Sequence, residues 1–150
     1  MTAVVSHENE LLLNTVQCFL NDEIYPHEDA VDRSGEVPLE LGRQIEARAK
    51  QMGLFAANLP EDVGGGGLNY TSSAIVEREY GKTTHALQSW IARPTELLLA
   101  CEGDQIARYL DPCVTGEKRE LFALTEPEAG SDVMGMKTNA KRDGHDWILN

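Results

Sequence analysis

The sequence predicts a mainly α-helical fold that leads into the first strands of a β-domain. Two segments between Ser6 and Met52 repeat apolar residues at spacings of three and four, which is the period of a helix with one buried face. After Gly116 the chain becomes turn-rich, and Asp143-Gly144 lies between two β-compatible segments, which is a strong hairpin signal. These features indicate a helical unit followed by the start of a sheet.

The first predicted helix extends from Ser6 to about Val31. The Ser6 hydroxyl is expected to cap its first turn, and Pro26 is expected to interrupt its second half because proline lacks a backbone N–H. A second helix is predicted from Pro38 to Met52, and Gly53 ends it. Both helices are amphipathic and therefore need a partner surface.

The chain from Leu54 to Leu68 is predicted to be irregular, and a third helix is predicted between an N-cap at Thr71 and a stop at Gly81. Shorter helical patterns follow over residues 84–92, 95–101 and 104–113. In the last part of the chain, residues 121–125 are predicted to be a strand, and residues 136–142 and 145–150 are predicted to pair as a hairpin. A lone hairpin is marginally stable in water, so we expect the chain to be the front part of something larger.

The composition argues against two classes of partner. The chain has 150 residues and a formal net charge of −12, from Lys+Arg 13 and Asp+Glu 25. This excess of acid disfavours binding to nucleic acid or to an anionic membrane surface. No apolar run approaches the ~20 residues that span a bilayer, and the N-terminus has the pattern of neither a secretory signal nor a transit peptide. We therefore expect a cytoplasmic protein.

Cysteine and glycine usage offers no site for a metal ion or a nucleotide. Cys18, Cys101 and Cys113 are scattered and form no CxxC pair, so they are predicted to be buried thiols in a reducing compartment. The run Gly64–Gly67 lacks the Lys-Ser/Thr that follows the glycines of a phosphate loop. It is interpreted as a flexible connection between two helices.

The segment Phe122–Asp132 contains the residues best suited to bind a ligand. A β-edge that enters a loop with proline and glycine exposes backbone N–H and C=O groups, and Thr125 and Ser131 add hydroxyls. Such groups can bind a planar, amide-like ring at one end and a phosphate oxygen at the other. On residue chemistry alone, a capped surface loop whose side chains satisfy local backbone groups is the favoured interpretation.

The same segment resembles the flavin-binding signature of the acyl-CoA dehydrogenase family, in which an apolar strand runs into Thr-Glu-Pro-x-Ala-Gly-Ser-Asp. Leu59–Leu68 is similar to the loop between early helices of that family, and the likeness extends from about Leu11 onward. The resemblance implies an N-terminal helical bundle domain over residues 1–118. It also implies that residues 119–150 are the first strands of an incomplete, β-barrel-like middle domain.

The resemblance further implies which residues bind ligands. Ser131 would lie near the CoA portion of an acyl-CoA substrate, and Gln88 and Ile91 would line the acyl pocket, although ordinary helix packing is an equal alternative for that stretch. Glu128 stands where many members have glycine, and its side chain is expected to point to solvent. Six residues would contact FAD, the implied cofactor: Phe122, Ala123, Leu124, Thr125, Gly130 and Ser131.

The implied activity is α,β-dehydrogenation of an acyl-CoA thioester in fatty acid metabolism, with electrons passed to an electron-transfer flavoprotein. The full-length enzyme would be a homo-oligomer, since the family is commonly tetrameric. The catalytic glutamate is expected beyond residue 150, so the 150 residues alone are predicted to be inactive. Two alternatives stay open. One is another flavoenzyme of the superfamily, such as an acyl-CoA oxidase, a nitroalkane oxidase or a flavin monooxygenase. The other is a non-catalytic helical interaction module.

Overall fold

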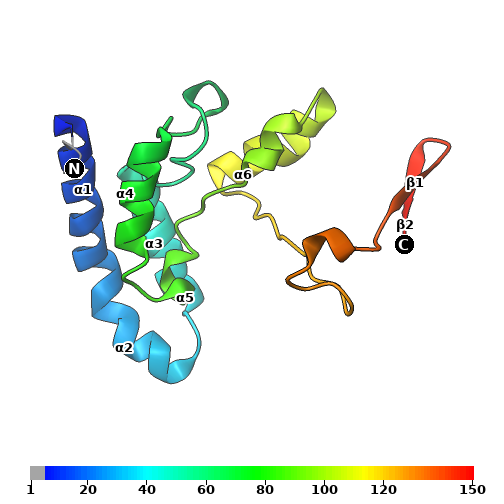
Figure 1. Cartoon of the computed structure of the whole chain (residues 1–150). Helices are drawn as coiled ribbons and strands as arrows, with labels where there is room; N and C mark the ends of the chain where they lie inside the picture. The colour runs from blue at the N-terminus through cyan, green and yellow to red at the C-terminus, as the bar shows by residue number, and fades with distance from the viewer. Residues whose placement is uncertain (1–5) are drawn as a thin grey trace, which may run out of the picture. The chain divides into compact units, whose positions relative to one another are not determined.

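The computed structural model describes residues 6–150, which divide into two compact units. The first unit ends at Glu120 and the second covers Leu121–Asn150. The first unit is helical, whereas the second contains a short two-stranded sheet (Figure 1). The predicted mainly α-helical fold with the beginning of a sheet is confirmed.

Helix α1 (His7–Phe19) begins where the sequence predicts it. The Ser6 hydroxyl accepts a hydrogen bond from the backbone N–H of Asn9 at 3.2 Å, which confirms the predicted cap. The chain then passes through a π-helical turn (Leu20–Ile24) into α2 (Tyr25–Ser34), and Pro26 lies in the first turn of α2. The predicted interruption is therefore real, because proline is tolerated in a first turn, where its missing N–H removes no intrahelical hydrogen bond.

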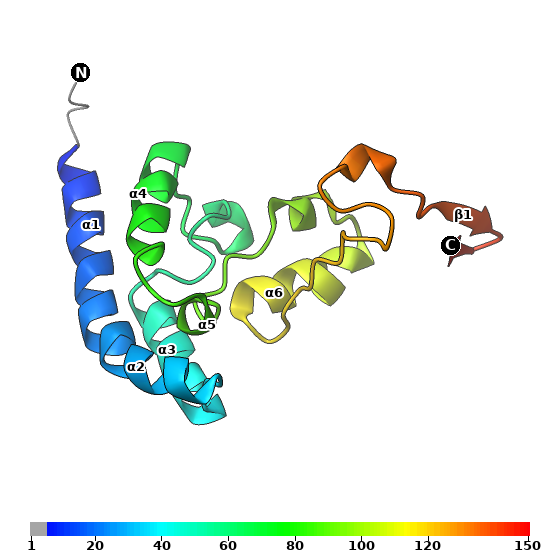
Figure 2. The ribbon, with the colours of Figure 1, turned by 60° about the horizontal axis from the view of Figure 1, so that its bottom comes forward.

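Two further long helices contribute to the core of the first unit. Helix α3 (Leu39–Gln51) agrees with the prediction, and Gly53 after it adopts a φ of 70°. Helix α4 (Tyr70–Tyr80) is capped by Asn69, whose side chain accepts from the backbone N–H of Ser72 at 3.0 Å. The predicted cap at Thr71 is wrong, because asparagine caps a helix at least as well as threonine and stands earlier in the chain. Helices α1 and α4 lie side by side (Figures 1 and 2).

The shorter helical patterns produce smaller elements than expected. Residues 84–92 form only a four-residue helix, α5 (His85–Gln88), and residues 95–101 form the 3-10 helix Glu96–Ala100. Residues 104–113 form a helical segment that includes the π-helical turn Ile106–Leu110 and leads into α6 (Asp111–Thr115). The apolar core of the unit collects side chains from nearly all of these elements, among them Val16, Phe19, Ile24, Ile45, Leu59, Tyr80, Leu87 and Ile91.

The irregular stretch between α3 and α4 is held together by its own backbone. The N–H of Gly65 donates to the carbonyl of Pro60 at 2.9 Å, and the N–H of Gly67 donates to the carbonyl of Leu59 at 2.8 Å. A Cβ built on Gly65 would lie only 2.2 Å from the Leu59 carbonyl oxygen. Gly64–Gly67 lies in the connection between α3 and α4, as interpreted, but these hydrogen bonds and close backbone contacts contradict the expectation that the connection is flexible. The glycines allow two backbone segments to approach more closely than a side chain permits.

Helix α4 contains a buried carboxylate that the sequence does not reveal. The Glu79 side chain is 2% exposed and accepts from Lys82 Nζ at 2.5 Å, from Arg78 Nη2 at 3.0 Å and from Gln17 Nε2 of α1 at 3.2 Å. The hydrogen bond from Lys82 is the largest cause that lowers the pKa of Glu79, to about 2. Glu79 therefore joins α4 to α1 in its ionised form.

Replacing Glu79 with glutamine is expected to flatten the dependence of folding stability on acid pH. A carboxyl whose pKa is lower in the folded than in the unfolded chain stabilises the fold above its ordinary pKa of 4.5, and this contribution is lost as pH falls toward 2. The full shift corresponds to ~3 kcal/mol, and solvent screening of the exposed partners Lys82 and Arg78 reduces it to about 2 kcal/mol. Urea unfolding at several pH values from about 5 down to about 2 measures this contribution. Parallel curves for the wild type and the variant would contradict the assignment, and Glu40→Gln on the exposed face of α3 is the control.

The second unit contains one antiparallel hairpin, β1 (Ala140–Asp143) and β2 (Asp146–Leu149). Asp143 pairs with Asp146, so the central turn residues are Gly144 and His145, one position later than the predicted pair. Gly144 has a φ of 62°, as a glycine at the first central position of a tight hairpin turn requires. The strand predicted over residues 121–125 is wrong, because these residues have no strand partner in the described part of the chain.

The cysteines differ from the prediction in one case. Cys113 is buried and burial raises the pKa of its thiol, whereas Cys101 is half-buried. Cys18 is exposed, since it lies on the solvent face of α1 between the buried residues Val16 and Phe19. The prediction of buried thiols is therefore wrong for Cys18.

Candidate functional site

The segment Phe122–Thr125 presents an unpaired backbone. Its N–H and C=O groups make no hydrogen bond within residues 6–150, and neither does the Thr125 hydroxyl. Phe122 is 72% exposed, and Ala123 and Thr125 are exposed as well, while Leu124 is half-buried. A polar backbone that lacks a partner needs one when it becomes buried. The stretch therefore offers the alternating donors and acceptors that the edge of an amide-like ring can use.

Glu126 closes the loop that follows this stretch. Its backbone N–H donates to the Ala129 carbonyl at 3.0 Å, and the Ala129 N–H donates back at 3.2 Å. The Glu126 carboxylate accepts from the backbone N–H groups of Lys137 and Thr138, both at 2.9 Å. These backbone donors, that of Lys137 first, hold the pKa of Glu126 below its ordinary value. Glu126 thereby fixes the loop between the apolar stretch and the hairpin.

The far end of the loop is open around Gly130 and Ser131. Both residues are exposed, and a Cβ built on Gly130 would meet no atom within 4 Å. The Asp132 backbone carbonyl accepts from the N–H of Gly135 at 3.0 Å, which begins a short 3-10 turn. Glu128 is exposed, as expected, and its carboxylate pairs with the Lys137 ammonium. Space for a ligand therefore exists beside the Gly130 backbone.

Replacing Glu126 with glutamine in the whole protein is expected to loosen this loop. The amide keeps one acceptor oxygen, but its NH₂ group faces one of the two backbone donors, so one charge-assisted hydrogen bond is lost. The amide hydrogens of Lys137 and Thr138 should then exchange with solvent several times faster, because one of the two loses its acceptor. Hydrogen exchange followed by mass spectrometry measures this. Glu128→Gln, which removes a carboxylate that contacts only a side chain, should leave both amides protected.

Gln88 and Ile91 lie in the first unit, and both are buried. Ile91 belongs to the apolar core at 1% exposure. The Gln88 amide donates weakly to the Tyr80 carbonyl at 3.4 Å and accepts from Arg93 Nη2 at 3.2 Å. Within the described chain, both side chains therefore make the contacts of an ordinary helical core. Their contact with an acyl chain remains a prediction.

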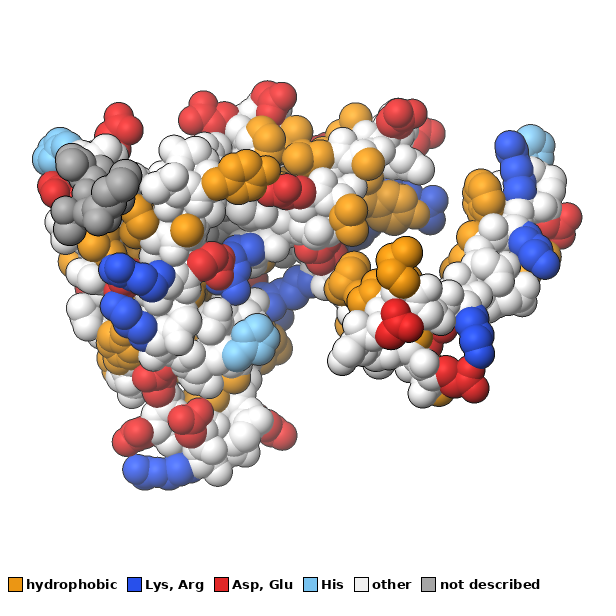
Figure 3. Space-filling view, in the orientation of Figure 1, with side chains coloured by type: hydrophobic (Ala, Val, Ile, Leu, Met, Phe, Trp, Pro, Cys, Tyr) orange, Lys and Arg blue, Asp and Glu red, His pale blue; other side chains and the backbone are white. Residues whose placement is uncertain are grey.

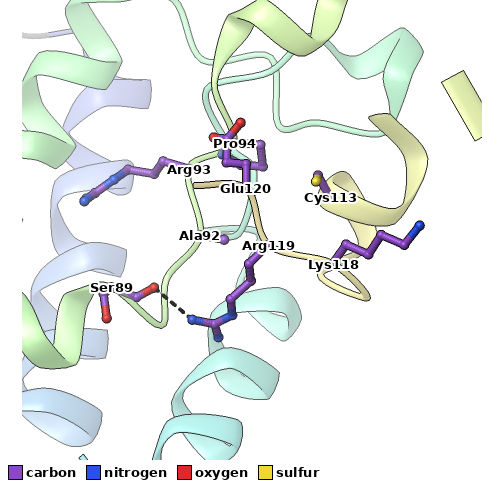
Figure 4. Close-up of a pocket in the computed structure, with 8 residues that line it drawn as sticks. All are labelled: Ser89, Ala92, Arg93, Pro94, Cys113, Lys118, Arg119 and Glu120. Carbon is purple, nitrogen blue, oxygen red and sulfur yellow. Dashed lines mark hydrogen bonds between the residues drawn. The ribbon is translucent and has the colours of Figure 1, made fainter. Parts of the chain in front are cut away.

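A cavity of about 310 Å³ lies beside this stretch, and its lining includes Ser89, Ala92, Pro94 and Cys113 (Figure 4). Its basic residues are already engaged. Arg119 donates to the Ser89 carbonyl at 3.4 Å and to Glu46 at 2.7 Å, and its guanidinium lies 4.2 Å from the centre of the Trp90 ring. The cluster of Arg119, Glu46 and Trp90 cannot be predicted from the sequence, because Glu46 and Arg119 are 73 positions apart and belong to no motif.

The described residues offer neither a metal site nor a membrane-spanning helix. Acidic and basic side chains are interspersed over the visible face of the first unit (Figure 3). Residues 6–150 contain no group of three or more His, Cys, Asp or Glu side chains arranged to hold a metal ion. None of the helices in the same range is both long enough and apolar enough to cross a membrane.

Comparison with known proteins identifies relatives over nearly the whole chain. Residues 6–117 match the family described as "Acyl-CoA dehydrogenase, N-terminal domain". The mitochondrial long-chain specific acyl-CoA dehydrogenase of Sus scrofa is 36% identical over 152 residues, which cover 98% of this chain and 34% of that protein. A subunit of the caffeyl-CoA reductase-Etf complex of Acetobacterium woodii is 34% identical over 151 residues, which cover 97% of this chain and 39% of that protein. The chain thus spans little more than a third of the length of these relatives.

Solved structures agree with this result. Glutaryl-CoA dehydrogenase from Mycobacterium smegmatis superposes with a TM-score of 0.80 and 27% identity, over 99% of this chain and 39% of that one. An acyl-CoA dehydrogenase from Bacillus anthracis, complexed with FAD, superposes with a TM-score of 0.75 and 28% identity, over 97% of this chain and 25% of that one.

Proposed function

Because this chain belongs to the acyl-CoA dehydrogenase family, we propose that the whole protein is an FAD-dependent oxidoreductase acting on the α,β carbon–carbon bond of an acyl-CoA thioester. The family match over residues 6–117 carries the proposal. The unpaired backbone of Phe122–Thr125 supports it, since these residues supply the hydrogen-bonding groups that a flavin ring requires. FAD held by these residues would supply a hydride acceptor for the acyl β-carbon, and a carboxylate of the whole protein would take the α-proton.

Each part of the chain then has a proposed role. Residues 1–118 form the N-terminal helical domain, and residues 119–150 begin the middle β-domain. Phe122–Thr125 hydrogen-bond the ring edge of the cofactor, and the open backbone at Gly130 admits its pyrophosphate. Ser131, one position further, donates its hydroxyl near the same phosphates and near the CoA portion of the substrate. Glu126 does not contact the ligand but positions the loop through Lys137 and Thr138.

A second candidate is the reverse reaction, reduction of an α,β-unsaturated acyl-CoA. The relative from Acetobacterium woodii is named as part of a reductase complex, and its identity of 34% is nearly that of the long-chain dehydrogenase. The two directions use the same flavin, the same thioester and the same two electrons, so the N-terminal residues serve both. The name of that complex also supports an electron-transfer flavoprotein as the partner. A homo-oligomer and a cytoplasmic location remain our predictions for the whole protein.

The test uses the whole protein with its cofactor. We expect purification to yield a protein with the absorbance of oxidised flavin, which bleaches when a saturated acyl-CoA is added without oxygen. Electrons should then pass to an electron-transfer flavoprotein faster than to oxygen, whereas the opposite order would favour an oxidase. If the reduced protein is reoxidised by an enoyl-CoA but is not bleached by any saturated thioester, the reductase direction is correct. A whole protein that never binds flavin would refute the proposal.

A further inference from the structure

The last three residues of the first unit, Lys118–Glu120, lie outside its helices, yet each of them is held by hydrogen bonds. The Lys118 backbone N–H donates to the Pro112 carbonyl of α6 at 2.9 Å, and Lys118 Nζ donates to the Arg108 carbonyl at 3.0 Å. The Glu120 carboxylate accepts from the backbone N–H of Thr95. Both ends of this segment are therefore tied to helical parts of the first unit.

Arg119, the middle residue, makes the contacts that reach furthest along the sequence. Its Nη2 group donates to the Glu46 carboxylate of α3 at 2.7 Å, and its Nη1 group donates to the Ser89 carbonyl at 3.4 Å (Figure 4). The guanidinium also lies 4.2 Å from the centre of the Trp90 ring, within the range of a cation–π interaction.

The ion pair between Arg119 and Glu46 differs from an isolated pair on the surface. The Glu46 side chain is only 16% exposed, and it also accepts from Lys50 Nζ at 2.6 Å. Networks of charged hydrogen bonds with a shielded member hold their geometry better than solvent-exposed pairs do. Arg119 therefore fixes the segment to α3 and to the stretch that carries Ser89 and Trp90.

The place of this segment in the sequence gives its contacts a consequence. Glu120 is followed by Leu121 and then by Phe122, where the proposed FAD-binding stretch begins. Two residues of extended chain span at most ~7 Å, so a fixed Glu120 restricts the position of the Phe122 backbone. The backbone of Phe122–Thr125 has no hydrogen-bond partner of its own within residues 6–150. A flexible stretch that is held at one end loses less conformational entropy when it binds a ligand.

We propose that Lys118–Glu120 anchors the FAD-binding stretch and that Arg119 is the positioning residue of this anchor. The inference rests on the proposed function, which assigns Phe122–Thr125 to FAD. Arg119 does not contact the cofactor but acts through the backbone that it holds. A direct role of these charges in binding the FAD phosphates is disfavoured, because the Lys118 and Arg119 side chains already donate to oxygens of the first unit.

The affinity of the whole protein for FAD tests the proposal. We expect Arg119→Ala to raise the dissociation constant several-fold when the protein freed of cofactor is titrated with FAD. Arg119→Lys should restore part of the affinity, since lysine keeps the charge opposite Glu46 but loses the planar fork and its stacking. Arg108→Ala is the matched control. The Arg108 guanidinium also lies over an aromatic ring, that of the adjacent Tyr109 at 5.2 Å, but it makes no hydrogen bond or ion pair within residues 6–150.

Two further measurements separate positioning from a general loss of stability. At saturating FAD, the visible circular dichroism of the flavin depends on its surroundings and should change in Arg119→Ala but not in Arg108→Ala. Without FAD, the amide hydrogens of Thr95 and Lys118 should exchange several times faster in Arg119→Ala, because the anchor that protects them is loosened.

The outcomes distinguish the anchor from the proposed function. Unchanged exchange at Thr95 and Lys118 would show that Arg119 does not hold the segment, and this would overturn the proposal. Wild-type affinity and dichroism in Arg119→Ala would refute the positioning role alone. A wild-type protein that binds no FAD would instead refute the proposed function, and the positioning role with it.

Discussion

Replacing Gly65 with alanine is expected to destabilise the first unit by ~3 kcal/mol or more. The new Cβ would lie 2.2 Å from the carbonyl oxygen of Leu59 and 2.4 Å from its carbonyl carbon, and these are backbone atoms of a fully buried residue. Overpacking of this kind costs about 1–3 kcal/mol. Moving the loop away would also break the hydrogen bonds from Gly65 to Pro60 and from Gly67 to Leu59, at roughly 1 kcal/mol each. Urea unfolding of the whole protein measures the loss.

The control for this variant is Gly81→Ala. Gly81 has a φ of −62°, a value that alanine adopts freely, and a Cβ there would approach only the Glu77 and Arg78 carbonyl oxygens, at 3.3 and 3.7 Å. We expect this change to alter the free energy of unfolding by less than ~0.5 kcal/mol. Equal effects at Gly65 and Gly81 would show that the glycine run is a loose connection after all.

The features that the sequence predicts correctly depend on neighbours along the chain. The cap at Ser6, the interruption at Pro26 and the stop at Gly53 each follow from the chemistry of one residue and from its nearest hydrogen-bond partners. The same local logic places the β-hairpin within one residue of its observed turn at Gly144 and His145. Where two capping residues compete over a short span, as Asn69 and Thr71 do, local reasoning cannot choose between them.

The features that the sequence does not predict depend on residues far apart in it. The glycine run packs against Leu59 and Ala57, Glu79 reaches Gln17 on another helix, and Arg119 finds Glu46 and Trp90. No spacing or motif connects such partners. The same limit applies to the candidate site. Resemblance locates the segment Phe122–Asp132, but the role of Glu126 as a double acceptor is visible only when Lys137 and Thr138 are in place.

Replacing Gly42 on helix α3 with alanine should lower the free energy of unfolding, whereas the same change at an exposed helical glycine raises it. In an exposed helix, alanine is more favourable than glycine by about 1 kcal/mol. Here the Cβ would lie 2.1 Å from the Trp90 ring, at Cε2, and the Arg119 guanidinium, 4.2 Å from the centre of that ring, limits how far the ring can move. We expect Gly42→Ala to cost about 1–3 kcal/mol of unfolding free energy.

A second substitution separates this steric cause from any effect on the helix itself. Trp90→Leu removes the ring that the new methyl group would meet, so in that background Gly42→Ala should become neutral or stabilising by up to ~1 kcal/mol. The sign of the alanine effect should therefore reverse between the two backgrounds, and urea unfolding of the wild type, the two single variants and the double variant gives both values. An equal loss of unfolding free energy in the wild-type and Trp90→Leu backgrounds would mean that the backbone at Gly42, and not Trp90, excludes a side chain. If the sign does reverse, the contact between α3 and Trp90 is what positions the stretch that carries Gln88 and Ile91 against the helical core.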